Sequence, residues 1–205
     1  MGGPVSAPAV SPEQERVLRL LSPLLPPDAY LAGGVAIAAR LHHRRSRDLD
    51  LFVERTDPLD LTDALAAAGA RIVSRAEGTL YVELEGIPAS IIRYSYPLLA
   101  PPEPVLGVKA ESLEDLACMK LSAIASRGKA RDFWDLHELL GHGAAGLADL
   151  LESFRRKYAG HDVGHVVRSL VYFADAESEP MPEGLDAPRW EAIKGDLSRR
   201  VLALH

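Results

Sequence analysis

Cysteine is almost absent from this chain: its 205 residues include one, Cys118. A single cysteine builds no disulfide framework within the chain, which favours a reducing cytoplasmic compartment. Because Cys118 lies inside a helical pattern, we interpret it as a small buried hydrophobe rather than a nucleophile. The sequence also has no apolar run long enough to cross a membrane, and its first residues lack the basic and apolar stretches of a secretory signal. We therefore expect a cytoplasmic protein with no membrane partner.

An excess of positive charge is also missing, because the net charge is −6 at pH 7. This balance argues against an extended, non-specific nucleic-acid surface. The basic residues are biased towards arginine, and some of them cluster in one segment with two histidines: Arg40, His42, His43, Arg44, Arg45 and Arg47. A local patch of this kind can still hold phosphates at one site. The alternative interpretation is a set of ordinary helix-surface arginines.

What is present is the composition of an ordinary globular protein. Apolar residues make up 47% of the chain and charged residues 25%, both near the average. Hydrophobic periodicity predicts helices and strands up to about residue 105, and helices alone beyond it. In the first half it predicts helices at 11–25, 35–41 and 57–68, strands at 30–32, 48–53, 71–74, 79–85, 87–94 and 105–108, and a proline-rich linker at 97–104.

The expected fold is therefore α+β. A small mixed β-sheet flanked by helices forms the first domain, residues 1–105, and a C-terminal helical bundle forms the second, residues 106–205. We expect residues 1–10 to be a frayed terminus.

The segment with the clearest chemistry is a short apolar strand, a glycine pair, a helix, and a second strand with two aspartates. Gly33 and Gly34 let the backbone turn tightly and approach a ligand closely. The helix that follows presents free N–H groups and the positive end of its dipole, which suits a phosphate chain. Asp48 and Asp50 lie on one face of the next strand, where two carboxylates can share divalent cations with a triphosphate. Each piece alone is a common turn or a solvated edge; the combination in this order predicts a metal and phosphate site.

This arrangement resembles the nucleotidyltransferase superfamily, and in particular its AbiEii/AbiGii-type toxin branch. The first motif of that branch is similar to LAGGVAIAARLHHRRSRDLDLFV here, which includes Arg44 and Ser46. A second motif is similar to the later helical segment with Lys120, Arg127 and the string KARDFWDL. The resemblance runs from about residue 31 to residue 140, and the last 60 or so residues match no motif.

For the first motif, the resemblance implies that Asp48 and Asp50 coordinate Mg²⁺, or Mn²⁺ in its place. Gly33 and Gly34 would receive the β- and γ-phosphates of an NTP. Ser46 would line the nucleotide pocket, with Arg44 as a further nucleotide-binding residue.

For the second motif, the resemblance implies that Lys120 contacts the triphosphate and that Asp132 helps to shape the catalytic pocket. Lys120 and Arg127 are seven residues apart, so both lie on one face of a helix and can line one cleft. We therefore include Arg127 among the nucleotide-binding candidates. Without the resemblance, Lys120 would be interpreted as a solvated surface residue, and Arg131 with Asp135 as an ordinary ion pair at helical spacing.

One residue departs from the superfamily pattern, which usually supplies a third carboxylate from a later strand. The position expected to hold it is Ser90, and a hydroxyl does not carry the charge of a carboxylate. Glu83 and Glu85 on the neighbouring strand are candidate substitutes, although each is also consistent with a solvated strand residue. The departure bears on activation of the acceptor more than on nucleotide binding.

The resemblance implies transfer of a nucleoside monophosphate from an NTP to an acceptor hydroxyl, with the helical half closing one side of the cleft. In the toxin branch the acceptor is typically RNA, notably the 3′ end of tRNA, and a cognate antitoxin is a further expected partner. Two alternatives stay open: a transferase that modifies a small molecule such as an antibiotic, and a catalytically degenerate nucleotide-binding module that regulates a partner.

Overall fold

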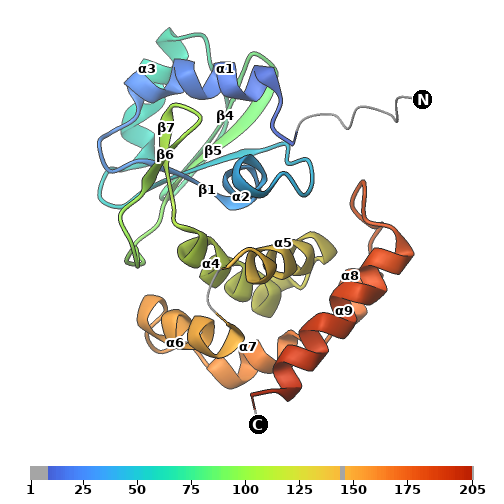
Figure 1. Cartoon of the computed structure of the whole chain (residues 1–205). Coiled ribbons are helices and arrows are strands. Elements are labelled where there is room, and N and C mark those ends of the chain that lie inside the picture. Colours follow the sequence, from blue (N-terminus) through green and yellow to red (C-terminus); the bar gives the residue numbers. More distant parts are fainter. Residues whose placement is uncertain (1–8, 144–145, 205) are drawn as a thin grey trace, which may run out of the picture. The chain divides into compact units, whose positions relative to one another are not determined.

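The chain divides into two compact units in the computed structural model, which describes residues 9–143 and 146–204. Unit 1 comprises residues 1–95 and 102–111, and unit 2 comprises residues 96–101 and 112–205. The first unit contains the strands and the second is helical (Figure 1). This division confirms the predicted α+β class.

Unit 1 is built on one seven-stranded mixed sheet with the strand order β3-β4-β5-β2-β1-β7-β6. Its strands are β1 (Tyr30–Ala32), β2 (Leu49–Val53), β3 (Arg71–Ala76), β4 (Thr79–Leu84), β5 (Ile87–Arg93), β6 (Glu103–Val105) and β7 (Val108–Ala110). β2 lies between β1, to which it runs antiparallel, and β5, to which it runs parallel. The strand with the two predicted aspartates is therefore internal to the sheet.

The core of unit 1 follows from alternation along these strands. Leu49, Leu51 and Val53 of β2 are fully buried, and the intervening Asp50 projects to the opposite face. Helices α1 (Pro12–Leu21) and α3 (Thr62–Ala67) lie on one side of the sheet, as Figure 1 shows. The face that carries Asp50 is the other one, and it is the face available for a site.

The helix α2 (Gly33–Leu41) begins directly after β1 and packs against β1 and β2. Its apolar residues Val35 to Ala38 are buried. It ends at His42, whose φ of 52° places it in the left-handed region. The chain then turns back into the loop 43–48 that leads to β2.

One sequence expectation on unit 1 needs correction. Residues 103–110 form a hairpin of β6 and β7 with positive φ at Leu106 and Gly107, where the sequence predicted the end of a linker and one strand. The domain boundary expected after residue 105 falls inside this hairpin, and in the structure residues 96–101 belong to unit 2 and residues 102–111 to unit 1. Most of the terminus expected to be frayed lies outside the described residues, but Ala9 and Val10 are buried.

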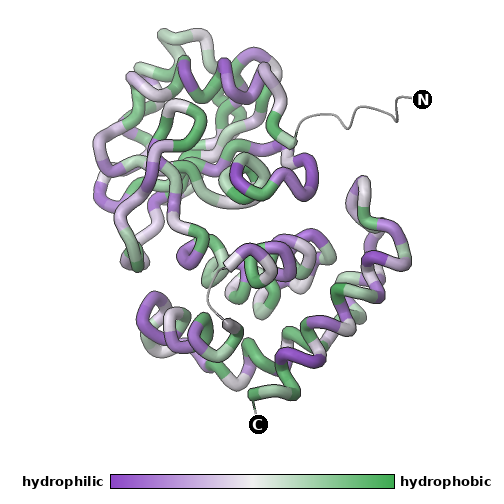
Figure 2. Tube along the Cα trace, in the orientation of Figure 1, coloured by the Kyte–Doolittle hydropathy of each residue, from purple (hydrophilic) through white to green (hydrophobic). Residues whose placement is uncertain are grey.

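Unit 2 contains α4 (Leu113–Arg127), α5 (Ala130–Gly141), α6 (Leu147–Lys157), α7 (Val163–Ser169), α8 (Ala174–Glu177) and α9 (Ala187–Leu202). Helix α4 is central, because it packs against α5, α6 and α7, while α9 packs against α5. Hydrophilic and hydrophobic residues alternate along α9, as expected for a helix with one buried face (Figure 2). In the described ranges, no helix is long and apolar enough to span a membrane.

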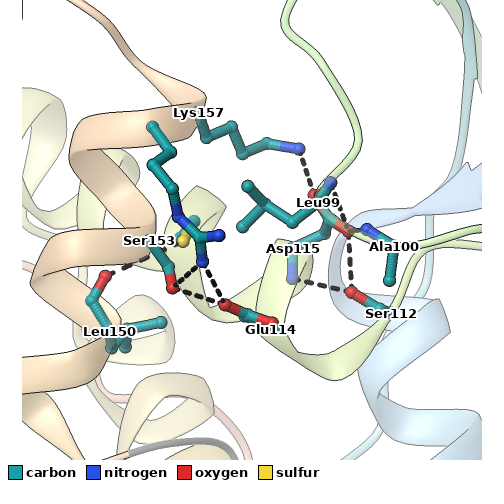
Figure 3. Close-up of polar contacts among 10 residues, drawn as sticks. Leu99, Ala100, Ser112, Glu114, Asp115, Leu150, Ser153 and Lys157 are labelled. Carbon is teal, nitrogen blue, oxygen red and sulfur yellow. Dashed lines mark hydrogen bonds and ion pairs between the residues drawn. The ribbon is translucent and has the colours of Figure 1, made fainter.

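A buried ion pair fastens the segment 96–101 to the helices of unit 2 (Figure 3). The ammonium of Lys157 lies 2.7 Å from a carboxylate oxygen of Asp115 and also donates to the carbonyl of Pro97, and both charged side chains are fully buried. Asp115 in addition accepts hydrogen bonds from the N–H groups of Leu99 and Ala100. Lys157 is thus the internal counter-charge of Asp115.

Candidate active site

The first sequence motif is assembled around the start of α2, where Gly33 has a φ of +64°. A Cβ atom on Gly33 would lie 2.4 Å from Oδ2 of Asp50. Only a residue without a side chain leaves room for the Asp50 carboxylate at this point. The glycine is therefore required twice, for its backbone conformation and for the close approach of Asp50.

The second glycine of the pair is required for a different reason. Gly34 has an ordinary helical backbone, but a Cβ there would lie 2.5 Å from Oγ of Ser46 and 2.9 Å from a guanidinium nitrogen of Arg44. The structure thus brings Arg44 and Ser46 against the first turn of α2. These are the residues that the sequence assigned to nucleotide binding, together with the glycine pair, and they lie close together in unit 1.

The loop that carries Arg44 and Ser46 is held from behind by Gln14 of α1. This side chain is buried, and its amide donates to the carbonyl oxygens of Ser46, at 2.8 Å, and of Arg47, at 2.9 Å. The oxygen of the same side-chain amide completes the capping box of α1 by accepting a hydrogen bond from the backbone N–H of Ser11. One residue therefore fixes both the start of α1 and the loop before β2.

Asp50 and Ser90 are cross-strand partners on β2 and β5, and the Ser90 hydroxyl donates a 2.8 Å hydrogen bond to Oδ1 of Asp50. The serine expected at the third-carboxylate position thus lies directly beside Asp50. Asp48 precedes β2 by one residue and is exposed; by alternation it lies on the same face as Asp50. Ser90 orients one oxygen of Asp50 without adding charge.

Neither candidate substitute for the third carboxylate lies beside Asp50 and Ser90. Glu83 pairs across the strands with Pro88 rather than with Ser90, and its carboxylate forms a 2.7 Å ion pair with Arg71. Glu85 lies beyond the end of β4 with a φ of 51°, and it is 2.6 Å from a guanidinium nitrogen of Arg16. Both carboxylates are thus neutralised by arginines away from Asp50.

The second sequence motif forms a compact charge cluster within unit 2, between α4 and α5. The buried ammonium of Lys120 lies 3.0 Å from Asp132 and 2.8 Å from Asp135. Arg127 donates two hydrogen bonds to Asp132, at 2.9 and 3.0 Å. Burial alone would raise the pKa of the Asp132 carboxyl, but the charges of Lys120 and Arg127 hold it below its usual value.

This cluster changes the interpretation of two expectations. Lys120 is not a solvated surface residue, because its charge is buried against two carboxylates. Asp135 pairs with Lys120, so its role is not confined to a surface pair with Arg131. Arg127 is the exposed member, with 45% of its side chain accessible. The predicted site residues therefore form two groups, one in each unit.

The donor set of unit 1 suits a divalent cation of the Mg²⁺ type. Such ions take hard oxygen ligands, commonly one or two carboxylates with phosphate oxygens. Asp48 and Asp50 offer such oxygens, and the absence of a Cβ atom on Gly33 leaves space beside the Asp50 carboxylate. Among the described residues, no group of three or more His, Cys, Asp or Glu side chains is arranged to hold a metal.

Comparison with known proteins decides the family. The model of the family described as "Nucleotidyl transferase AbiEii toxin, Type IV TA system" matches residues 17–203. The chain belongs to the AbiEii family. An uncharacterized protein of Aquifex aeolicus is 38% identical over 182 residues, which is 85% of this chain and 86% of that protein. By family, the AbiEii chain is a toxin-like enzyme of the nucleotidyltransferase class.

Solved structures share the fold of this AbiEii chain. MenT4, a nucleotidyltransferase toxin from Mycobacterium tuberculosis, matches with a TM-score of 0.65 and 18% identity over 94% of this chain and 82% of that chain. ANT(2″)-Ia, solved in complex with adenylyl-2″-tobramycin, matches with a TM-score of 0.54 and 19% identity over 72% of this chain and 99% of that chain. These likenesses confirm the predicted nucleotidyltransferase fold.

Sequence reasoning missed two features of these units. Gln14 carried a local signal, because it stands three residues after Ser11 in a capping box, but its bonds to residues 46 and 47 are non-local. The Asp115–Lys157 pair joins residues 42 positions apart. No motif spacing indicates such a contact, and a run of cations at a helix end has a sufficient local explanation.

Proposed function

We propose that this AbiEii chain transfers a nucleoside monophosphate from an NTP to a hydroxyl of RNA, with the 3′ end of tRNA as the favoured acceptor. The observation that carries the proposal is the packing of Asp50 against Gly33 at the start of α2. It joins a carboxylate suited to a metal with a helix start suited to phosphates. Family membership supports an NTP substrate and a cognate antitoxin as partner.

In this proposal the N–H groups at the start of α2 bind the β- and γ-phosphates, and Asp48 and Asp50 would hold Mg²⁺. The bound cation would supply charge stabilisation at the reacting phosphate. The acceptor oxygen forms a bond to the α-phosphorus. The bond between the α-phosphorus and the oxygen that bridges it to the β-phosphate breaks, and pyrophosphate leaves. Ser90 holds Asp50 in position through its hydrogen bond, and the hydroxyl proton passes to water.

The second motif has a supporting role in this scheme. Because the Lys120 ammonium is engaged by Asp132 and Asp135, we assign Lys120 and Asp132 to shaping the α4–α5 pair. Arg127 is the member of the cluster with an accessible guanidinium, and its assignment to nucleotide binding stays a prediction from the sequence.

The basic segment before β2 supports a nucleic-acid acceptor, although not all of its arginines are available. Arg40 is half-buried and donates to the carbonyl oxygens of Ala36 and Ala110. Arg45 and Arg47 are exposed and can contact an RNA backbone. Replacing both with alanine should weaken RNA binding. The number of phosphate contacts inferred from the salt dependence of binding should fall by about two. An unchanged salt dependence would remove the segment from the proposal.

One assay tests the proposed function: purified protein, Mg²⁺, each labelled NTP in turn, and total tRNA or an aminoglycoside. Label on tRNA supports the proposal. Label on the aminoglycoside alone would overturn the RNA acceptor and favour small-molecule modification, the chemistry of the ANT(2″)-Ia complex.

A second candidate function is a nucleotide-binding regulatory module, and Ser90 is the observation that favours it. In that case the wild type binds NTP but transfers nothing. Ser90→Asp, which restores a third carboxylate beside Asp50, would then switch transfer on. A wild type that already transfers label excludes the regulatory function as its sole role.

A further inference from the structure

A continuous row of residues crosses the sheet through the proposed site. Cross-strand pairing places Ala32 beside Asp50, Asp50 beside Ser90, Ser90 beside Tyr81, and Tyr81 beside Ser74. Paired residues of neighbouring strands project from the same face of a sheet. Asp50, Ser90 and Tyr81 therefore share one face.

Tyr81 is the unusual member of this row, because 44% of this large aromatic residue is exposed. Its neighbours on β4, Leu80 and Val82, are buried in the core on the opposite face. Two strand spacings separate Tyr81 from Asp50, which is about 10 Å between their backbones. The side chains of Tyr81 and Asp50 thus project from one face of the sheet, two strands apart.

The direction of the proposed reaction places the acceptor on the β5 and β4 side of Asp50. In an in-line displacement the attacking and leaving oxygens lie on opposite sides of the phosphorus. Pyrophosphate leaves towards Gly33 and the start of α2, on the β1 side of Asp50. The attacking hydroxyl therefore arrives from the other side, where β5 and β4 carry Ser90 and Tyr81.

The charge near Tyr81 favours a neutral, flat group over a cation. The nearest carboxylate along β4 on this face is Glu83, and Arg71 neutralises it at 2.7 Å. An exposed ring beside a neutralised pair suits a nucleobase, because every base has a face that stacks on an aromatic side chain. A polycationic aminoglycoside would instead require carboxylates available for pairing.

We propose that Tyr81 is a stacking platform for a base at the end of the RNA acceptor. The proposal rests on the proposed nucleotidyltransferase function and assigns the acceptor side of that same site. The ring holds the terminal nucleotide with its hydroxyl directed towards Asp50, and it makes no contact with the triphosphate. Tyr81 is thus a determinant of acceptor binding rather than a catalytic residue.

The test compares Tyr81→Ala, Tyr81→Phe and the control Tyr172→Ala, which removes a tyrosine of unit 2 that is 56% exposed. The readouts are the KM for total tRNA, the KM for the NTP, and the affinity for a short single-stranded RNA without NTP. Tyr81→Ala should raise the KM for tRNA and weaken oligonucleotide binding by about 5- to 150-fold, the range expected for loss of one stacked base. The KM for the NTP should not change, and Tyr81→Phe and Tyr172→Ala should behave as wild type.

The outcomes separate this proposal from the proposed function. If the wild type labels no acceptor, the proposed function fails whatever the Tyr81 variants do. If the wild type labels tRNA and Tyr81→Ala keeps its KM for tRNA, the stacking platform is wrong. A rise in the KM for the NTP alone would also overturn it, because Tyr81 would then belong to the pocket of the incoming nucleotide. Circular dichroism of each variant identifies any loss of folded protein.

Discussion

Replacing Gly33 with alanine should damage the site far more than it damages the fold. The new Cβ would lie 2.4 Å from Oδ2 of Asp50, and ordinary contact begins at 3.4 Å, so the carboxylate must retreat by 3.4 − 2.4 = 1.0 Å. A displacement of about 1 Å at a reacting centre costs on the order of 100-fold in rate. The cost in stability is smaller, about 1–2 kcal/mol for a non-glycine residue in the left-handed region, because the nearest obstructing atom is the end of a side chain that can rotate, and Cβ of Asp50, at 3.2 Å, needs to shift only slightly.

Gly86→Ala is the matched control, since Gly86 also has a positive φ but a Cβ there meets no atom within 4 Å. Both variants should lose similar free energy of unfolding in urea. Only Gly33→Ala should lose transfer of labelled nucleotide, by about 100-fold. Full transfer by Gly33→Ala, or an equal loss in Gly86→Ala, would refute the conclusion that Gly33 is required to leave space for the Asp50 carboxylate.

Three further predictions concern unit 2. Lys157→Met should lower the free energy of unfolding in urea by about 3–5 kcal/mol, because it leaves the charge of Asp115 buried, whereas the exposed control Arg155→Met should cost at most about 1 kcal/mol; equal losses would contradict the buried pair. Because the folded-state pKa of Asp132 is depressed, the stability that Asp132→Asn removes should be fully present above the unfolded pKa of about 3.9. It should disappear as the pH falls through the lower folded-state pKa, and a difference between wild type and variant that instead grew on acidification would show the opposite shift. Burial raises the pKa of Cys118 to about 12, so iodoacetamide at pH 8 should modify the unfolded chain and spare the native one, as mass spectrometry would detect.

Local patterns were sufficient to predict the helices and strands around the first motif. Alternation placed Asp50 opposite Leu49 and Leu51, and the glycine pair marked the start of α2, because both signals lie within a few residues. The third-carboxylate position at Ser90 was also predicted, and the cross-strand pair of Asp50 with Ser90 is what the structure shows.

The features that sequence did not provide are those fixed by contacts between distant residues. The burial of Lys120 depends on how α4 packs against α5, and the same residue would be a solvated cation on an isolated helix. The ion pairs of Glu83 and Glu85 depend on which arginine each strand meets. The placement of Tyr81 on the same face as Asp50 follows from strand register, and no periodicity in β4 distinguishes it from an ordinary exposed tyrosine.

The central claim is that Asp48 and Asp50 form the metal-binding centre of a nucleotidyltransferase. The most direct measurement compares Mg²⁺-dependent transfer of labelled nucleotide to tRNA by the wild type and by the double variant Asp48→Ala, Asp50→Ala, after circular dichroism has verified that both are folded. The wild type should label the acceptor and lose the activity when Mg²⁺ is removed, and the double variant should label nothing. Transfer that persists in the folded double variant would contradict the assignment.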